Sequence, residues 1–261
     1  MIKTKVIGRV FRQDEIADQI YDMWIETELA QGARPGQFVC VYTRNAAALL
    51  PRPISICEVN EEKTMLRLVY RTVGKGTNEF ATYHAGAEIS LLGPLGNGFP
   101  VEKAAGKRVF LIGGGIGIPP MLQLSKEIKK AGQAYCELSV LGYRNELFLN
   151  TDLEKYSQVY VATEDGSTGT KGTVLDAIKE KGLSGDVIFA CGPMPMLRAI
   201  KEYAAANNME AYISLEEHMA CGVGACLGCV CKTKNVDAHS HVHNSRICTD
   251  GPVYNAEEVE I

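Results

Sequence analysis

Hydrophobic and polar residues alternate in short runs over the first hundred residues of the chain. Runs at residues 21–25, 37–42 and 66–71 each predict a β-strand with one buried face. Turns rich in glycine and proline separate the runs, for example at residues 93–98. Many short strands with such spacing predict a small antiparallel barrel over residues 1–100.

The pattern changes near residue 101. A continuous apolar strand at 108–112 leads into a glycine-rich turn and then into a helical pattern at 120–130. Further buried strands are expected at 137–141, 158–162, 187–190 and 211–215, with helices at 174–181 and 195–206. Strands that alternate with helices predict a doubly wound parallel sheet, the fold of a nucleotide-binding α/β domain, over residues 101–215.

The remaining residues, 216–261, are rich in glycine and cysteine and offer little apolar material for a core of their own. Five of the nine cysteines of the chain lie here. A disulfide scaffold is typical of short secreted proteins, so clustered cysteines in this chain favour metal or cluster binding. The spacing Cys221-x4-Cys226-x2-Cys229, followed by a distant Cys248, is the plant-type [2Fe–2S] ferredoxin pattern. We therefore predict a small C-terminal [2Fe–2S] cysteine-loop domain with these four ligands.

Other interpretations of the cysteines remain open. Structural zinc is an alternative, although zinc sites usually take two close pairs rather than a triplet and a single cysteine. A Rieske centre would use histidines, and His239, His241 and His243 alternate nearby, but a solvated loop explains them as well. Cys231 is expected to be a bystander.

Two weaker motifs in the barrel suggest a flavin site. Arg52-Pro53-Ile54-Ser55 is expected at the end of a β run, where the arginine could pair with a pyrophosphate and the serine with the flavin ring edge. Gly76 and Thr77, at the start of a predicted helix, would offer free N–H groups to the same phosphates. Because R-x-x-S recurs by chance, an ordinary strand end is the alternative.

Three strand ends in the α/β part suggest a nicotinamide site. Gly114 and Gly115 lie in the glycine-rich turn after the first strand, where a tight structural turn is the alternative reading. Cys191 and Gly192 end another buried strand and begin a helix. The pair that follows a third strand, Glu164 and Asp165, would bind ribose hydroxyls and repel a 2′-phosphate, which favours NAD over NADP.

Charge and length exclude some classes of function. The formal net charge is −4 without a long run of either sign, which argues against nucleic acid as a partner. No signal-peptide pattern and no apolar stretch long enough for a membrane span are found, so we expect a cytoplasmic protein that does not enter a membrane.

Taken together, these motifs resemble those of the ferredoxin–NADP reductase superfamily, whose members carry R-x-Y-S, G-x-G-x-x-P and C-G-P motifs. With the C-terminal segment, the whole chain is similar to the electron-transfer subunits of dihydroorotate dehydrogenase B. This narrower resemblance rests on residues 52–55, 69–71, 76–77, 216–226 and 248–253. It implies that FAD is contacted by Arg52, Pro53, Ile54, Ser55, Val69, Tyr70, Arg71, Gly76 and Thr77.

The resemblance also implies a relay in pyrimidine biosynthesis. Electrons would pass from the FMN of a separate dihydroorotate dehydrogenase catalytic subunit through the [2Fe–2S] cluster to FAD and then to NAD⁺, in a heterotetramer of two plus two subunits. Two departures from the superfamily are visible: Ile54 replaces the tyrosine that stacks on the flavin, and the C-terminal aromatic residue is missing. We therefore expect a more open flavin, with one face covered by the cluster segment or the partner.

Two alternatives stay open at this point. The chain could belong to another ferredoxin/NAD(P)H oxidoreductase or to a hydrogenase, which share the barrel and the nucleotide-binding domain. It could also be a redox sensor that binds a flavin or an iron–sulfur cluster and catalyses no reaction.

Overall fold

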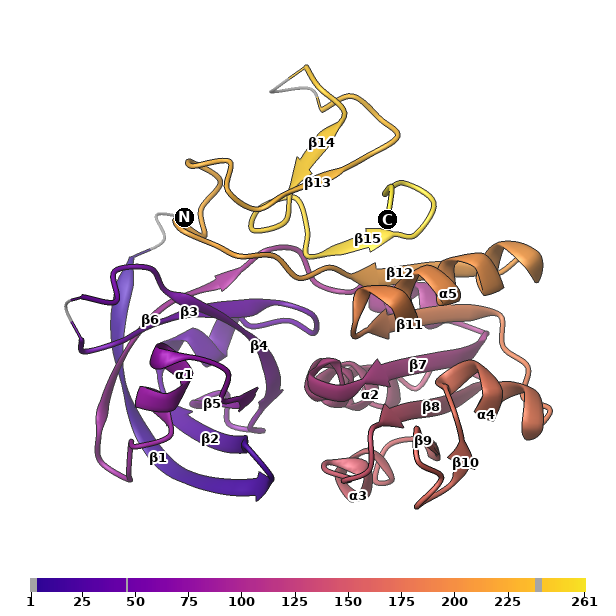
Figure 1. Ribbon diagram of the computed structural model, residues 1–261, viewed down its shortest axis with the longest axis horizontal. Coiled ribbons are helices and arrows are strands. Elements are labelled where there is room, and N and C mark those ends of the chain that lie inside the picture. The colour runs from indigo at the N-terminus through magenta and orange to yellow at the C-terminus, as the bar shows by residue number, and fades with distance from the viewer. Residues whose placement is uncertain (1–3, 46, 238–240) are drawn as a thin grey trace.

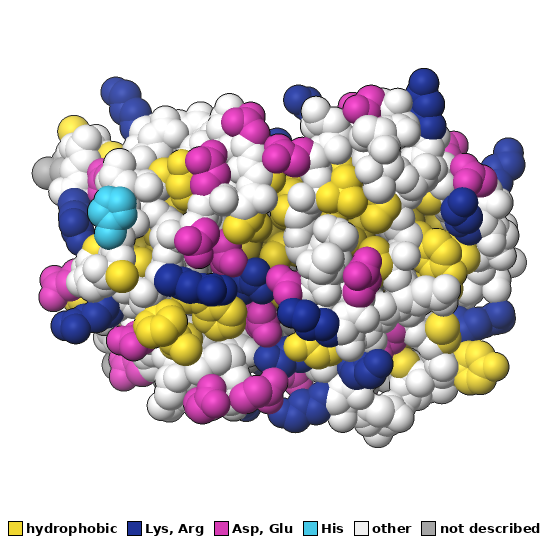
Figure 2. Space-filling view, turned by 90° about the horizontal axis from the view of Figure 1, so that it is seen from below, with side chains coloured by type: hydrophobic (Ala, Val, Ile, Leu, Met, Phe, Trp, Pro, Cys, Tyr) yellow, Lys and Arg dark blue, Asp and Glu magenta, His cyan; other side chains and the backbone are white. Residues whose placement is uncertain are grey.

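A computed structural model describes residues 4–45, 47–237 and 241–261. The chain forms three parts: a barrel, a mixed sheet covered by helices, and a C-terminal segment that lies across both (Figure 1). Over the face in Figure 2, acidic and basic side chains are interspersed. No helix among the described residues is long and apolar enough to cross a bilayer.

The first part is a closed antiparallel barrel with the strand order β1-β2-β5-β4-β3-β6. Its strands are β1 (Lys5–Ala17), β2 (Ile20–Glu26), β3 (Phe38–Tyr42), β4 (Arg52–Val59), β5 (Met65–Arg71) and β6 (Glu88–Leu95); the 3-10 helix η1 (Glu28–Gly32) and helix α1 (Lys75–Phe80) connect them. The three predicted strands are confirmed as β2, β3 and β5. The prediction for the R-P-I-S motif is wrong, because this motif begins β4 rather than ending a strand.

The second part is a seven-stranded sheet with the order β10-β9-β8-β7-β11-β12-β15. Six of its strands are parallel: β7 (Arg108–Gly114), β8 (Cys136–Tyr143), β9 (Gln158–Thr163), β10 (Thr170–Lys171), β11 (Val187–Cys191) and β12 (Glu210–Ser214). Alternate residues of β7 and β11 pack on opposite faces. One face packs against α2 (Pro119–Ala131) and α3 (Asn150–Leu153), and the other against α4 (Val174–Glu180) and α5 (Met194–Ala206). The predicted doubly wound fold is therefore confirmed.

The described residues of the C-terminal segment share a hydrophobic core with the other two parts. Strands β13 (Val230–Lys232) and β14 (Asn244–Arg246) pair as a hairpin, and β15 (Val253–Asn255) runs antiparallel to β12 at the edge of the large sheet. Buried residues of the segment, such as Cys229, Ile247 and Tyr254, belong to one hydrophobic cluster with Cys40 of the barrel and Ile213 of the sheet. The segment is thus held by both of the other parts.

Candidate functional site

The four predicted cluster ligands lie close together although Cys248 is distant in sequence. The thiol of Cys221 contacts that of Cys226, and the thiol of Cys248 contacts that of Cys229. Gly222 and Gly224, with φ of +69° and +80°, make the sharp turns that bend the loop around the sulfurs. The sulfurs therefore form two pairs, and a [2Fe–2S] cluster requires two thiolates on each iron.

Backbone N–H groups of the loop point at these sulfurs. Cys221 Sγ accepts from Val223 at 3.4 Å and from Ala225 at 3.3 Å, and Cys248 Sγ accepts from Gly224 at 3.2 Å. Burial opposes ionisation of Cys221, but these N–H donors and the Cys226 contact outweigh it and lower the pKa of the Cys221 thiol to about 7. The loop therefore favours thiolates, the form in which cysteine binds iron.

Cys248 differs from Cys221. Burial and the nearby thiols of Cys229 and Cys221 raise the pKa of Cys248 to about 12. Sulfurs this close repel one another as thiolates unless positive charge lies between them, and the irons of a cluster would supply that charge. The donor set thus fits an iron–sulfur cluster.

The remaining candidate ligands have other neighbours. Cys231 lies on β13, and its thiol contacts the phenol of Tyr254. The ring of His243 is hydrogen-bonded through Nδ1 to the carbonyl oxygen of Lys234 at 2.9 Å. His239 lies outside the described residues. Within the part of the chain that the structure describes, no three His, Cys, Asp or Glu side chains are grouped as ligands of a single metal ion.

On the barrel, the structure brings Arg52, Gly76 and Thr77 together. Arg52 extends over the first turn of α1, and a Cβ added to Gly76 would lie 2.0 Å from Arg52 Nε. The Arg52 guanidinium donates to the carbonyl oxygen of Leu50 at 2.5 Å. Thr77 Oγ1 accepts from the N–H groups of Val73 and Gly74, which fixes the start of the helix. An arginine next to the first turn of a helix fits a flavin diphosphate.

The other predicted flavin residues differ in whether their side chains are accessible. The side chain of Tyr70 is buried, stacks on Tyr21 and donates a hydrogen bond to Gln13 Oε1 at 2.8 Å. Val69 is buried in the hydrophobic cluster that includes Ile20. Pro53, Ile54 and Ser55 are partly exposed along β4, and Arg71 is exposed at the end of β5.

A cavity of about 900 Å³ lies between the barrel and the carboxyl ends of the parallel strands. The barrel contributes residues 17–20 and Arg71 to its walls. From the sheet come the predicted residues Gly114, Gly115, Glu164 and Gly192. Space is restricted at two of these glycines, since a Cβ on Gly114 would lie 2.5 Å from Met196 Sδ and a Cβ on Gly192 would lie 2.4 Å from Met196 Cε. This edge of a parallel sheet is where nucleotides bind in such folds.

Two predicted nucleotide residues do not reach the cavity. Cys191 is fully buried beneath the strand end, and burial raises the pKa of its thiol. The carboxylate of Asp165 accepts from the N–H of Ser167 at 2.9 Å and closes its own turn. Sequence reasoning missed Arg144, Thr173 and Glu216, which also line the cavity. Arg144 and Thr173 follow the carboxyl ends of β8 and β10. Nucleotides bind at this edge of a parallel sheet, so the position of these two residues could have predicted their role.

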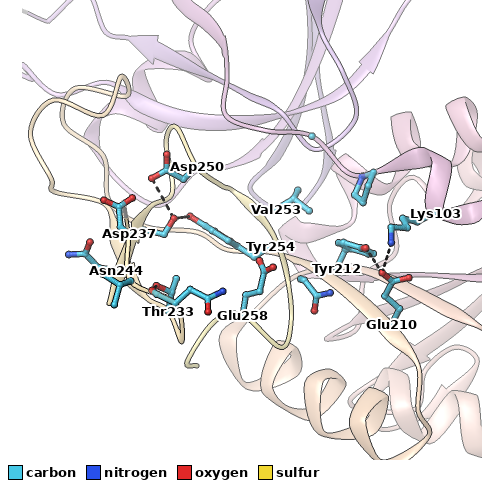
Figure 3. Close-up of a pocket in the computed structure, with 16 residues that line it drawn as sticks. Lys103, Glu210, Tyr212, Thr233, Asp237, Asn244, Asp250, Val253, Tyr254 and Glu258 are labelled. Atoms are coloured by element: carbon cyan, nitrogen blue, oxygen red, sulfur yellow. Dashed lines mark hydrogen bonds and ion pairs between the residues drawn. The ribbon is translucent and has the colours of Figure 1, made fainter. Parts of the chain in front are cut away.

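A second cavity of about 580 Å³ lies between the hairpin of β13 and β14 and strands β12 and β15 (Figure 3). Paired side chains line its walls. Tyr254 donates to Ser245 Oγ at 3.0 Å, and Lys103 forms an ion pair with Glu210 at 2.8 Å, which also accepts from Tyr212. These pairs tie the hairpin to β15 and connect β12 to the segment before β7.

A flavin-type barrel, a nucleotide cavity and a cysteine loop joined by the distant Cys248 define, in one chain, an NAD-linked iron–sulfur flavoprotein of the ferredoxin-reductase fold. Residues 216–260 match the family described as the iron–sulfur cluster binding domain of dihydroorotate dehydrogenase B, and residues 111–202 match the oxidoreductase NAD-binding domain. Two similar proteins are named dihydroorotate dehydrogenase B (NAD(+)), electron transfer subunit. That of Geobacillus sp. (strain WCH70) is 42% identical over 96% of both chains. That of Bacillus caldolyticus is 43% identical over 97% of this chain and 99% of its own. The chain belongs to this family of electron transfer subunits.

Solved structures agree with the fold. The NADH-dependent reduced ferredoxin-NADP oxidoreductase superposes with a TM-score of 0.87 at 29% identity, covering 98% of this chain and 90% of the other. A ferredoxin NADP+ reductase from Neisseria gonorrhoeae, solved with FAD and NADP, covers 78% of this chain and 91% of its own with a TM-score of 0.65. At 15% identity, this second likeness shows the fold alone.

Proposed function

We propose that this chain passes electrons from a partner dihydroorotate dehydrogenase catalytic subunit, through a [2Fe–2S] cluster and FAD, to NAD⁺. One contact carries the proposal. Gly222 of the cysteine loop packs on the barrel strand β3, where an added Cβ would lie 2.8 Å from Cys40 Sγ. Cys40 pairs across the sheet with Pro53 of the flavin motif. The cluster loop therefore rests on the strand next to the one that carries the flavin motif.

The proposal assigns each cofactor to residues of this chain. Cys221, Cys226, Cys229 and Cys248 would hold the cluster. Arg52, Gly76 and Thr77 would hold the flavin diphosphate, and residues 53–55 and 69–71 would lie along the flavin ring. Gly114, Gly115, Glu164 and Gly192 would hold NAD. The cofactors, when bound, supply single-electron and hydride transfer, while the protein supplies position and electrostatics.

Within this scheme the protein residues bind, orient and shield. The glycines of the cavity would let a nicotinamide approach the backbone closely, and Glu164, which lines the cavity, would offer a carboxylate to the ribose hydroxyls. Ile54 offers no aromatic ring, which supports a flavin that is open on that face. The domain limits 1–100, 101–215 and 216–261, the partner's FMN and the two-plus-two assembly are finer parts of the same proposal.

Cofactor analysis of anaerobically purified protein tests this function. We expect one FAD, two irons and two sulfides per chain, and reduction of dyes by NADH in preference to NADPH. Co-purified with its partner, the chain should support NAD⁺ reduction that depends on dihydroorotate. A preparation of folded protein without non-haem iron would contradict the proposal.

A second candidate is supported by the structural likeness to the NADH-dependent reduced ferredoxin-NADP oxidoreductase. In that case the chain would exchange electrons with a ferredoxin-type partner. Activity with reduced ferredoxin and none with dihydroorotate, in the presence of the native partner, would favour this candidate. The higher identity to the dihydroorotate dehydrogenase subunits supports the first.

A further inference from the structure

A buried arginine joins the barrel to the helix-covered sheet. Arg67 lies on β5 with its side chain 9% exposed. Within the barrel it forms a two-pronged pair with Asp22, from Nε to Oδ1 at 2.9 Å and from Nη2 to Oδ2 at 2.8 Å. Its Nη1 also reaches Asp152 Oδ2 of α3 at 3.0 Å, so the guanidinium bridges the two parts.

The acidic neighbours of Arg67 stabilise its positive charge. Burial alone would disfavour the cation, but Asp22, Asp152 and the other nearby groups outweigh it and raise the pKa of Arg67. The planar guanidinium donates at fixed positions: Nε and Nη2 bond to Asp22 inside the barrel, and Nη1 bonds to Asp152 of α3. Asp152 is held from its other side by Lys155 at 2.5 Å.

Helix α2 contacts the same side of the barrel through two of its side chains. Lys126 Nζ pairs with Glu58 Oε1 at 3.2 Å and donates to the carbonyl oxygen of Val59 at 3.0 Å. Gln123 Oε1 accepts from the N–H of Val59 at 2.8 Å. Glu58 also pairs with Arg67 at 3.1 Å, which links both contacts into one network across the junction.

Strand β5 connects this network to the nucleotide cavity, whose walls come from different parts of the chain. Arg71, in the wall, follows Arg67 on the same strand by four residues, about 13 Å at the usual rise of a strand. A rotation of about 5° around Arg67 would therefore move the barrel wall by about 1 Å relative to the sheet. At the rim, Glu146 Oε2 accepts from the N–H of Asp18 at 3.0 Å, and Ala17 and Ile20 share a hydrophobic cluster with Phe148.

We propose that Arg67 is a positioning residue for the nicotinamide step: through Asp152 it sets the angle between barrel and sheet, and with it the separation of flavin and nicotinamide. The inference rests on the proposed function, because it assigns the cavity to NAD. A misplacement of about 1 Å can cost about 100-fold in rate, so a contact remote from the reacting atoms is sufficient to control the step.

The test compares Asp152→Asn with Asp22→Asn in the holoprotein. Both remove one carboxylate charge from Arg67, but only the first acts on the contact between Arg67 and α3, while the Lys126 and Gln123 contacts remain in both variants. Stopped-flow reduction of the flavin by NADH gives the limiting rate and the half-saturating concentration. We expect about a tenfold lower limiting rate in Asp152→Asn at unchanged FAD and iron content, with recovery in Asp152→Glu. Asp22→Asn should lower the unfolding temperature and keep the rate within about twofold.

A second measurement does not depend on nicotinamide chemistry. Amide hydrogen exchange of residues 17–20 and 142–148, which line the cavity on opposite sides, should become faster in Asp152→Asn and stay unchanged in Asp22→Asn. Equal exchange in wild type and Asp152→Asn, or equal loss of rate in both variants, overturns the inference. Failure of wild-type protein to accept a hydride from NADH would instead refute the proposed function, and the exchange data would still decide whether Asp152 holds the two parts.

Discussion

Replacing Gly222 by alanine should dislodge the cysteine loop from the barrel. The residue has a φ of +69°, and an added Cβ would lie 2.8 Å from Cys40 Sγ and 3.2 Å from Leu95 Cδ1. Both neighbours are fully buried, so neither can move aside without disturbing the barrel. The backbone and the packing therefore both oppose a side chain at this position.

The two costs can be estimated separately. A left-handed conformation costs an L-residue about 1–2 kcal/mol, and an extra carbon in a packed site costs about 1–3 kcal/mol. The sum, about 2–5 kcal/mol, is a large share of the about 5–15 kcal/mol that stabilises a typical domain. Since the loop carries three of the four predicted ligands, we expect Gly222→Ala to retain less than about half of the wild-type iron.

Iron and sulfide analysis with the visible spectrum provides the assay. Gly106→Ala is the matched control, because Gly106 has a φ of +70° and open space where its Cβ would lie. Combining Gly222→Ala with Cys40→Ala should recover the packing part of the cost and leave the backbone part, as a double-mutant cycle would reveal. The reasoning is refuted if Gly222→Ala binds as much iron as the control, or if removal of the Cys40 sulfur brings no recovery.

Three further predictions test other parts of the structure. Cys231→Ser should leave the iron content unchanged while Cys248→Ser loses the cluster, and the reverse result in iron analysis would exchange their roles. Gly76→Ala should displace the Arg52 guanidinium, 2.0 Å from the new Cβ, and weaken FAD binding about tenfold in a fluorescence titration; unchanged affinity would exclude this arginine from the flavin site. Burial raises the pKa of Glu137 from 4.5 in the unfolded chain to about 7 in the folded protein. Between these pH values the folded protein keeps the proton and the unfolded chain loses it, so the free energy of unfolding falls as the pH rises. Glu137→Gln should therefore stabilise the protein by about 1 kcal/mol at pH 8, after allowance for partial exposure, and not at pH 4, as measured by urea unfolding.

The sequence predicts the α/β half of the fold more completely than the barrel. Parallel strands buried on both faces produce continuous apolar runs that cannot be missed, as in β7 and β11. Strand β1 was not identified, because only three of its thirteen residues are buried and most of the others face solvent. The motif at Arg52 was assigned to the wrong end of a strand, since a local pattern does not tell which neighbouring run continues it.

The candidate sites are also predicted unevenly: local motifs are visible in the sequence, and contacts between distant residues are not. Cysteine spacing predicts a ligand loop because three of the ligands are local, and the structure brings Cys248 to them. The sequence does not distinguish Glu164 from Asp165, since both are acidic and follow the same strand. In the structure Asp165 accepts from the N–H of Ser167 within its turn, and Glu164 lines the cavity. Arg67 was read as one polar position of an alternating run, because its partners are scattered along the chain.

Separate contacts control the two ends of the proposed relay. The cysteine loop meets the barrel at Gly222 on β3, and the sheet meets the barrel at Arg67 on β5. These contacts share no residue, so their energies should be nearly additive. A change at Gly222 should therefore lower the cluster content and leave the limiting rate of flavin reduction by NADH unchanged. A change at Asp152 should lower that rate and leave the cluster content unchanged. Joint loss of both properties in either variant would mean that the barrel transmits strain between β3 and β5, and the two electron steps would then have to be treated as coupled.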